Sequence, residues 1–113
     1  MSKTKRQRAI SDALGTLIPH VPFLDASEIR IKANQQHLRH LPAHIAVFLA
    51  TTSYVRHQYT DYDDLLREGL DRDAARYCVA DEMEATITSW GGSITAEELL
   101  AAPNESGEQD QSL

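Results

Sequence analysis

Nine consecutive residues, Arg56 to Asp64 (RHQYTDYDD), bring together the side chains best suited to chemistry in this chain. They include a guanidinium, an imidazole, two phenols and three carboxylates. An imidazole oriented by a carboxylate can act as a general base, so His57 with Asp61 or Asp63 would support proton transfer. Thr60 with Asp63 three residues later also suits the start of a helix, where side-chain oxygens accept backbone N–H groups. Because capping explains these acids, catalysis by His57 is the weakest of three functional hypotheses.

Further cations are predicted to converge on the same place. Arg72 and Arg76 lie one helical turn apart, so they share a face of the helix that should contain them. Convergent guanidinium groups suit phosphate or carboxylate. Two interpretations stay open: a salt-bridge network between the central and last helices, which is favoured, and a site for an anion. The anion-binding candidates are Arg56, His57, Tyr62, Arg72 and Arg76.

Nucleophilic and metal chemistry are less well supported. Cys78 is the one cysteine, which excludes an intramolecular disulfide, and we expect it to be a small core residue. Several histidines are spaced like metal ligands on a helix, although Pro42 interrupts the helix among them. These histidines are His37, His40, His44 and His57. We expect them at the surface, with no bound metal and no cofactor.

Charge is distributed very unevenly along the chain, whose net charge is −6. Up to His57 there are eight Lys or Arg against three Asp or Glu, and from Gln58 onward three against fourteen. Such asymmetry can mark a surface for an anionic partner. The favoured explanation is attraction between the two halves of one fold, because strong phosphate binders are usually basic overall. The nucleic-acid candidates are Lys3, Lys5, Arg6, Arg8, Arg30, Lys32 and Arg39.

Two noncatalytic hypotheses follow from this charge pattern. The first is a small binding or regulatory module that takes nucleic acid or an acidic protein on its basic N-terminal half. The alternative is a self-associating module, in which the basic half of one chain meets the acidic half of another to give a homodimer. No apolar run approaches the ~20 residues of a membrane span, and the N-terminus lacks the apolar core of a secretory signal. We expect a cytoplasmic, soluble protein with no membrane partner.

Helical periodicity dominates the sequence and predicts an all-α, compact single domain. We expect four or five helices around a central apolar helix at about 43–59. That segment is central because the chain carries no formal charge from Leu41 to Val55, and a helix that is apolar on several sides is generally buried. The expected parts are a basic arm (1–8), a helical domain (9–102) and a disordered acidic tail (103–113).

The boundaries of the helices follow from local signals. Pro19 and Pro22 end the first helix, and Phe23 and Leu24 should then tuck into the core. Asp25, three residues before Glu28, should start the second helix. Helix stops are expected at two glycines, and the last long helix should place one apolar stripe inward. The two stops are Gly69 and Gly91. The inward stripe consists of Ala75, Val79, Met83, Thr86, Ile87 and Trp90.

A combined motif runs through the second half of the chain. It consists of an Arg-His pair after an apolar helix, Thr-x-Tyr-Asp, Leu-Leu, a glycine, Arg-x-x-Ala-Arg and a closing Trp-Gly. Its residues are Arg56, His57, Thr60, Tyr62, Asp63, Leu65, Leu66, Gly69, Arg72, Ala75, Arg76, Trp90 and Gly91. The segment at about 41–92 thereby resembles the uncharacterised family called domain of unknown function 2293. The resemblance implies a small, soluble, mainly helical domain, and it brings no known activity, cofactor or catalytic residue.

Overall fold

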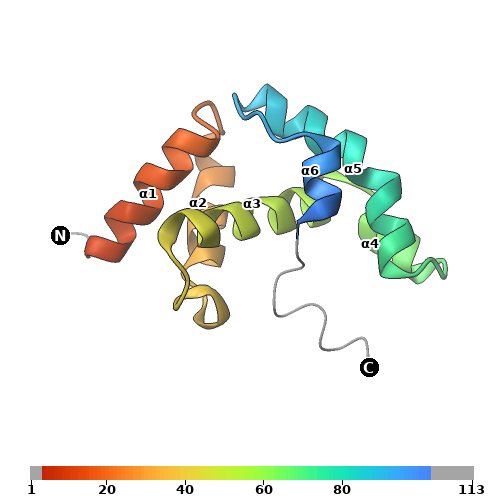
Figure 1. Ribbon diagram of the computed structural model, residues 1–113, viewed down its shortest axis with the longest axis horizontal. Coiled ribbons are helices and arrows are strands. Elements are labelled where there is room, and N and C mark those ends of the chain that lie inside the picture. The colour runs from red at the N-terminus through yellow and green to blue at the C-terminus, as the bar shows by residue number, and fades with distance from the viewer. Residues whose placement is uncertain (1–3, 103–113) are drawn as a thin grey trace.

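Helices connected by short turns form nearly all of the part that the computed structural model describes, residues 4–102 (Figure 1). The elements are α1 (Lys5–Leu17), α2 (Phe23–Ala33), the 3-10 helix η1 (Gln36–Leu38), α3 (Ala43–Tyr59), α4 (Tyr62–Arg67), α5 (Arg72–Ser89) and α6 (Ala96–Ala101). The all-α prediction is confirmed, and α3 has the bounds predicted for the central helix. Residues 4–102 hold six α-helices rather than four or five, because the six-residue α4 and α6 are separate elements.

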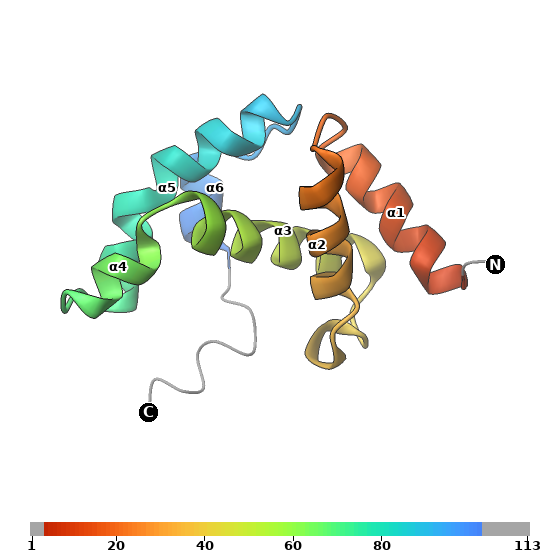
Figure 2. The same cartoon turned by 180° about the vertical axis from the view of Figure 1, so that it is seen from behind.

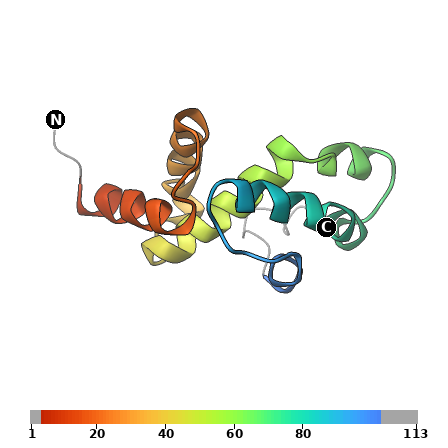
Figure 3. The same ribbon diagram turned by 90° about the horizontal axis from the view of Figure 1, so that it is seen from above.

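Helix α3 is the central helix of the described residues. The helices α1 and α2 pack against one part of it and α4 and α5 against the rest, while α6 packs on α5 (Figures 1 and 2). We call α1, α2 and η1 the N-terminal lobe, and α4, α5 and α6 the C-terminal lobe. Seen from above, α3 joins the two lobes (Figure 3). Small buried residues on α3, including Ala46, Ala50 and Ser53, let the neighbouring helices approach closely.

The lobes meet a second time, away from α3. The turn between α1 and α2 touches the turn between α5 and α6 (Figure 1), where the backbone N–H of His20 donates to the carbonyl of Trp90 at 2.8 Å. Gly91 ends α5 with a φ of +88°, as the predicted helix stop requires. The predicted inward stripe of α5 is also confirmed for Ala75, Val79 and Trp90, which are buried. The same holds for Met83 and Ile87.

Two predicted helix starts are wrong. Pro22, not Asp25, precedes the first residue of α2, and no side chain caps this helix. At α4 the capping position belongs to Asp61 rather than Thr60. The Thr60 hydroxyl accepts from the N–H of Tyr62 at 3.1 Å and donates to a carbonyl of α3 at 2.5 Å, so it serves the turn before α4.

Two predictions of burial are also wrong. Phe23 and Leu24 are 75% and 76% exposed, because α2 begins at Phe23 and turns its Asp25, Ala26 and Ile29 face toward the core. Cys78 is exposed, since Ala75 and Val79 occupy the inward positions of α5. A helix has only one inward stripe, and a sequence does not state which of several apolar residues will take it.

The first turn of α1 includes residues 5–8, which were predicted to form a basic arm. The helix begins there because Thr4 and Gln7 make a reciprocal capping box. The remainder of the predicted arm, 1–3 with Lys3, lies outside the described residues. The predicted tail at 103–113 also lies outside them, and the chain is described as far as Ala102.

Arg6 fastens α1 to the loop that precedes α3. Its guanidinium donates to the carbonyls of Leu41 at 2.6 Å and Leu38 at 3.1 Å. We expect Arg6→Ala to lower the free energy of unfolding by about 1–2 kcal/mol, because two partly buried carbonyls lose a charged donor. Chemical denaturation measures this loss. Lys5→Ala, an exposed change in the same turn, is the control and should stay within about 0.5 kcal/mol of wild type; equal losses would contradict the fastening role.

Candidate functional site

The end of α3 and the start of α4 bring three of the predicted anion-binding residues together. Arg56 is only 4% exposed, and its guanidinium carbon lies 5.6 Å from the centre of the Tyr62 ring. The imidazole of His57 meets the same ring edge-on at 5.3 Å. Tyr62, which is 1% exposed, therefore contacts both side chains with its ring. A cation over an aromatic ring is stabilised by the negative face of that ring.

The carboxylate of Asp63 contacts His57. The imidazole Nδ1 lies 2.8 Å from Oδ1, and both side chains are partly exposed. An ionised carboxylate only accepts hydrogen bonds, so Nδ1 is the donor and its proton is held at this position. This is the arrangement that the acid–base hypothesis requires. It also ties the end of α3 to the first turn of α4, a structural task that explains the pair without catalysis.

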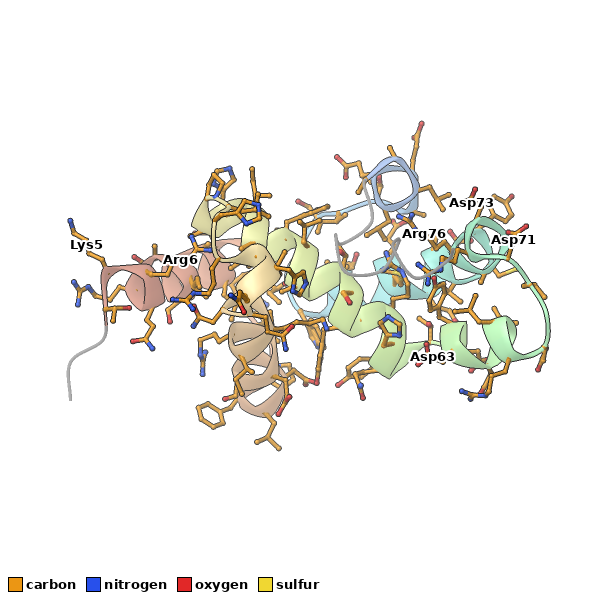
Figure 4. All side chains as sticks on the ribbon, turned by 90° about the horizontal axis from the view of Figure 1, so that it is seen from below. Lys5, Arg6, Asp63, Asp71, Asp73 and Arg76 are labelled. Atoms are coloured by element: carbon orange, nitrogen blue, oxygen red, sulfur yellow. The ribbon has the colours of Figure 1, made fainter. Side chains whose placement is uncertain are left out.

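The remaining two predicted anion-binding residues, Arg72 and Arg76, lie one turn apart on α5. Arg76 donates through Nη2 to the carbonyls of Leu99 at 3.3 Å and Ala102 at 3.2 Å, so it holds the last turn of α6. Arg72 stands one turn earlier on α5 and is partly buried. In Figure 4, Arg76 lies beside α6, with Asp63 on the neighbouring α4.

These candidate residues are already engaged. Arg56, His57, Tyr62, Arg72 and Arg76 all take part in further polar or ring contacts. The contacts described above are to two carbonyls, an aromatic ring and one carboxylate. Arg56, His57 and Tyr62 therefore meet where α3 leads into α4, and Arg76 connects α5 to α6.

One polar cluster was not predicted. Asp25, which is 9% exposed, accepts hydrogen bonds from the hydroxyls of Tyr54 at 2.5 Å and Tyr59 at 2.8 Å. Tyr59 continues the cluster, because its ring packs edge-on against Trp90 at 5.4 Å. The donors lie 29 and 34 residues from the acceptor, so no local pattern signals the contact. Asp25 thus connects α2 to α3 and, through Tyr59, to the end of α5.

The Asp25 cluster changes the acidity of both phenols. Burial of the ring, followed by the hydrogen bond to Asp25, raises the pKa of Tyr54 well above its usual range. For Tyr59 the hydrogen bond to Asp25 is the larger cause, and burial again adds to it in raising the pKa. Both shifts favour the neutral phenol, which can donate to the carboxylate.

The predicted nucleic-acid residues have unequal roles. The guanidinium of Arg6 donates hydrogen bonds to backbone carbonyls, whereas Lys5, Arg8 and Arg39 are exposed. Figure 4 shows Lys5 and Arg6 at the far end of α1 from the acidic residues Asp71 and Asp73. The remaining two described candidates, Arg30 and Lys32, are partly buried on opposite flanks of α2.

A groove runs along each flank of α2. The first, between α1 and α2, encloses about 340 Å³ and is lined by Gln7, Ile10, Ser11, Ser27, Arg30, Ile31 and Asn34. The second, between α2 and α3, encloses about 260 Å³ and is lined by Glu28, Ile31, Lys32, Gln35, Tyr54 and Gln58. Ile31 borders both grooves and is 60% exposed. The outer face of α2 is therefore a ridge that carries the exposed Ile31 and Glu28, with Arg30 beside it in the first groove and Lys32 in the second.

Comparison with known proteins establishes the family. The family model described as an uncharacterized conserved protein, DUF2293, matches residues 13–91. The chain belongs to this family. Neither a search of curated proteins nor one of solved structures found a match.

The DUF2293 match covers parts of both lobes. It confirms the resemblance at about 41–92 and extends it toward the N-terminus, across the second half of α1 and all of α2. The ridge of α2 and the five predicted anion-binding residues therefore lie inside the DUF2293 region, while α6 follows it and Lys5, Arg6 and Arg8 precede it.

The described part of this DUF2293 member shows neither a metal-binding cluster nor a membrane-spanning helix. Within residues 4–102, no three His, Cys, Asp or Glu side chains gather in a way that would hold a metal ion. His40 and His44 are exposed and His37 is partly buried in η1. Over the same residues, no helix combines the length and apolar character needed to cross a bilayer.

Proposed function

We propose that this protein is a noncatalytic binding module that holds an acidic, amphipathic helix of a partner protein against the outer face of α2. The observation that carries the proposal is the exposure of Phe23, Leu24 and Ile31, at 75%, 76% and 60%. Large apolar side chains gathered on one exposed face are typical of interaction sites. Aromatic residues together with arginine are also enriched at protein interfaces.

The geometry of α2 groups these side chains. Seven residues separate Leu24 from Ile31, which amounts to about two helical turns, so both point away from the buried side of the helix. That buried side is made of Asp25, Ala26, Ile29 and Ala33. Phe23 extends the ridge at the first residue of α2. A partner helix would cover this ridge with its own apolar stripe.

The charges beside the ridge favour an acidic partner. Arg30 and Lys32 line the grooves on its two sides, where Glu28 is the one acid among the lining residues, and Arg8 is exposed on the neighbouring α1. Carboxylates on either edge of an amphipathic helix would meet these cations while its apolar stripe meets Phe23 and Ile31. Such complementary charge gives specificity and faster association rather than most of the affinity.

A nucleic acid fits this surface less well. Binding to phosphates depends on many cations, and Arg6, one of the predicted set, is taken up by backbone carbonyls. The exposed centre of the surface is aliphatic and aromatic, with Leu24 and Ile31 offering nothing to a phosphate. A protein helix satisfies both the apolar ridge and its flanking cations.

Fluorescence anisotropy with defined probes tests the proposal. The probes are a labelled helical peptide with leucines on one face and glutamates elsewhere, a scrambled peptide of equal composition, and single- and double-stranded DNA and RNA. We expect the amphipathic peptide to bind and the scrambled one to bind at least about tenfold more weakly, a difference of ~1.4 kcal/mol. The double variant Phe23→Ala/Leu24→Ala should lose binding by a similar factor while its stability stays within about 0.5 kcal/mol.

Matched controls sharpen the result. Arg30→Ala should weaken binding of the peptide, whereas Arg67→Ala, which removes an exposed cation from the other lobe, should not. Binding of nucleic acid with a steep salt dependence, lost in Arg30→Ala and kept in Phe23→Ala/Leu24→Ala, would replace the protein partner by a nucleic acid. No binding of the peptide at about 100 μM would overturn the proposal. Dimers that disperse with salt in sedimentation and vanish in Phe23→Ala/Leu24→Ala would identify the partner as a second copy.

A further inference from the structure

We propose that a pocket between the two lobes binds a small monocarboxylic acid with an apolar body. The pocket encloses about 520 Å³ and lies between α1, α3 and the turn after α5. Sites for small molecules commonly enclose about 300–1,000 Å³ and combine apolar walls with a few polar groups. None of the lining residues borders a groove beside α2, so this inference is independent of the proposed partner surface.

Both lobes contribute to the pocket. Helices α1 and α3 supply every lining residue except Ser93, which belongs to the turn after α5. Gly92 brings this turn against the end of α1, since a Cβ on Gly92 would lie 3.1 Å from the carbonyl oxygen of Leu17. The absence of a side chain permits this close approach of two backbones. The contact between the lobes therefore places the hydroxyl of Ser93 beside residues of α1 and α3.

The walls of the pocket are apolar and incompletely covered by the protein. Helix α1 supplies Ala13 and Leu17, which are partly buried. Helix α3 supplies Phe48, which is partly buried, and Ile45, which is 38% exposed although it belongs to the central helix. An apolar ligand body placed here would remove these side chains from water, and that burial favours binding.

Three polar side chains line the same pocket. The hydroxyl of Thr16 donates to the carbonyl of Asp12 at 3.1 Å, so it remains available only as an acceptor. The imidazole of His44 and the hydroxyl of Ser93 are exposed and make no hydrogen bond to another side chain or backbone group within residues 4–102. Each of these two groups can donate to one oxygen of a carboxylate.

Charge at the pocket favours an anionic head group. No Asp or Glu is among the lining residues, and His44 is the one titratable group among them. Asp12 is exposed on α1 and is not a lining residue. The first turn of α3, which contains His44, carries no acid. A carboxylate can therefore pair with the imidazole, whose protonated form it stabilises, whereas an ammonium group would find no opposite charge in the lining.

NMR titration of the full chain tests this inference with three probes. Octanoate, 1-octanol and octylammonium share an eight-carbon chain and differ in the head group. We expect octanoate to shift the backbone amide resonances of Leu17, Ile45 and Ser93, with half-saturation at or below about 1 mM. Octanol should bind at least about threefold more weakly and octylammonium at least about tenfold more weakly, because neither can pair a negative charge with His44.

Variants of the pocket separate the head group from the apolar body. His44→Ala and Ser93→Ala should each weaken octanoate binding by about threefold or more and leave octanol binding nearly unchanged, because they remove only donors. Ile45→Ala should weaken both ligands by a similar factor, because it removes part of the shared apolar wall. His40→Ala, which removes an exposed histidine outside the lining, is the matched control and should bind octanoate like wild type.

Three results would overturn the inference. The first is the absence of octanoate-dependent shifts at about 10 mM in a folded protein. The second is octylammonium binding as tightly as octanoate, and the third is a set of shifts centred on Leu24 and Ile31 instead of the pocket. None of these results decides the proposal for α2, because that proposal is judged by binding of the helical peptide and its loss in Phe23→Ala/Leu24→Ala.

Discussion

Gly91→Ala is expected to lower the free energy of unfolding by about 3 kcal/mol. The φ of Gly91 is +88°, a left-handed conformation that costs a residue with a side chain about 1–2 kcal/mol. A Cβ placed there would also lie 2.9 Å from both the Pro19 ring and the His20 imidazole. The proline ring cannot move without moving the turn between α1 and α2, so this contact adds about 1–3 kcal/mol. Urea denaturation measures the total.

Two other glycines separate the causes of this loss. Gly69 also has a positive φ, of +111°, but a Cβ there would meet nothing within 4 Å, so Gly69→Ala should cost only about 1–2 kcal/mol. Gly15 lies in the exposed last turn of α1 with open space around it, and Gly15→Ala should stabilise by about 0.5–1 kcal/mol. A loss in Gly91→Ala no larger than in Gly69→Ala would show that the contact between the two turns does not hold the lobes together.

Asp25→Ala should lower the free energy of unfolding by about 2–3 kcal/mol. Two hydroxyls, on Tyr54 and Tyr59, lose a charged acceptor, and each such hydrogen bond contributes about 1.5–3 kcal/mol. Removing the cost of burying a carboxylate returns part of that sum. Denaturation of Asp25→Ala beside Asp12→Ala, an exposed aspartate expected to change stability by less than about 0.5 kcal/mol, isolates the effect.

The same cluster predicts a loss of stability in alkali. Both phenols have a pKa in the folded protein above the usual value of 10.0, by burial and the Asp25 bond for Tyr54 and by the Asp25 bond and burial for Tyr59. The unfolded chain releases these protons more readily, so their contribution is complete below pH ~10 and is lost as the pH rises through the folded pKa values. Phenolate absorbance against pH should show Tyr54 and Tyr59 titrating late in wild type and closer to pH 10 in Asp25→Ala. Titration that is the same in both proteins would contradict the cluster.

Local sequence patterns predicted where the helices lie but did not predict all of their ends. The uncharged run from Leu41 to Val55 predicted α3, because a helix without a polar face has to be surrounded by others. The start of α4 was misassigned because Thr60 and Asp61 are both plausible caps. The carboxylate of Asp63, expected to take part in the cap, contacts His57 instead. Helix caps are decided by competition among neighbours, which a sequence does not rank.

In the candidate site, too, contacts between residues close in sequence could be predicted, and contacts between distant residues could not. Arg56, His57 and Tyr62 are close in sequence, and their meeting at the end of α3 followed from that proximity. Two partners of Arg76 are carbonyls 23 and 26 residues away at the end of α6, and no local pattern predicts contacts over that separation. The apolar ridge of α2 was missed because Phe23 and Leu24 read as core residues until the direction of α2 is known.

The amino-acid sequence by itself determined the helical class, the central helix and the charge difference between the two halves, because each depends on composition or on periods of a few residues. Only the tertiary structure decided which apolar face remains exposed, that Asp25 binds two tyrosines of α3, and that Arg76 holds the end of α6. These outcomes depend on pairing groups more than 20 residues apart, and such pairing is set by how the helices pack rather than by any local pattern.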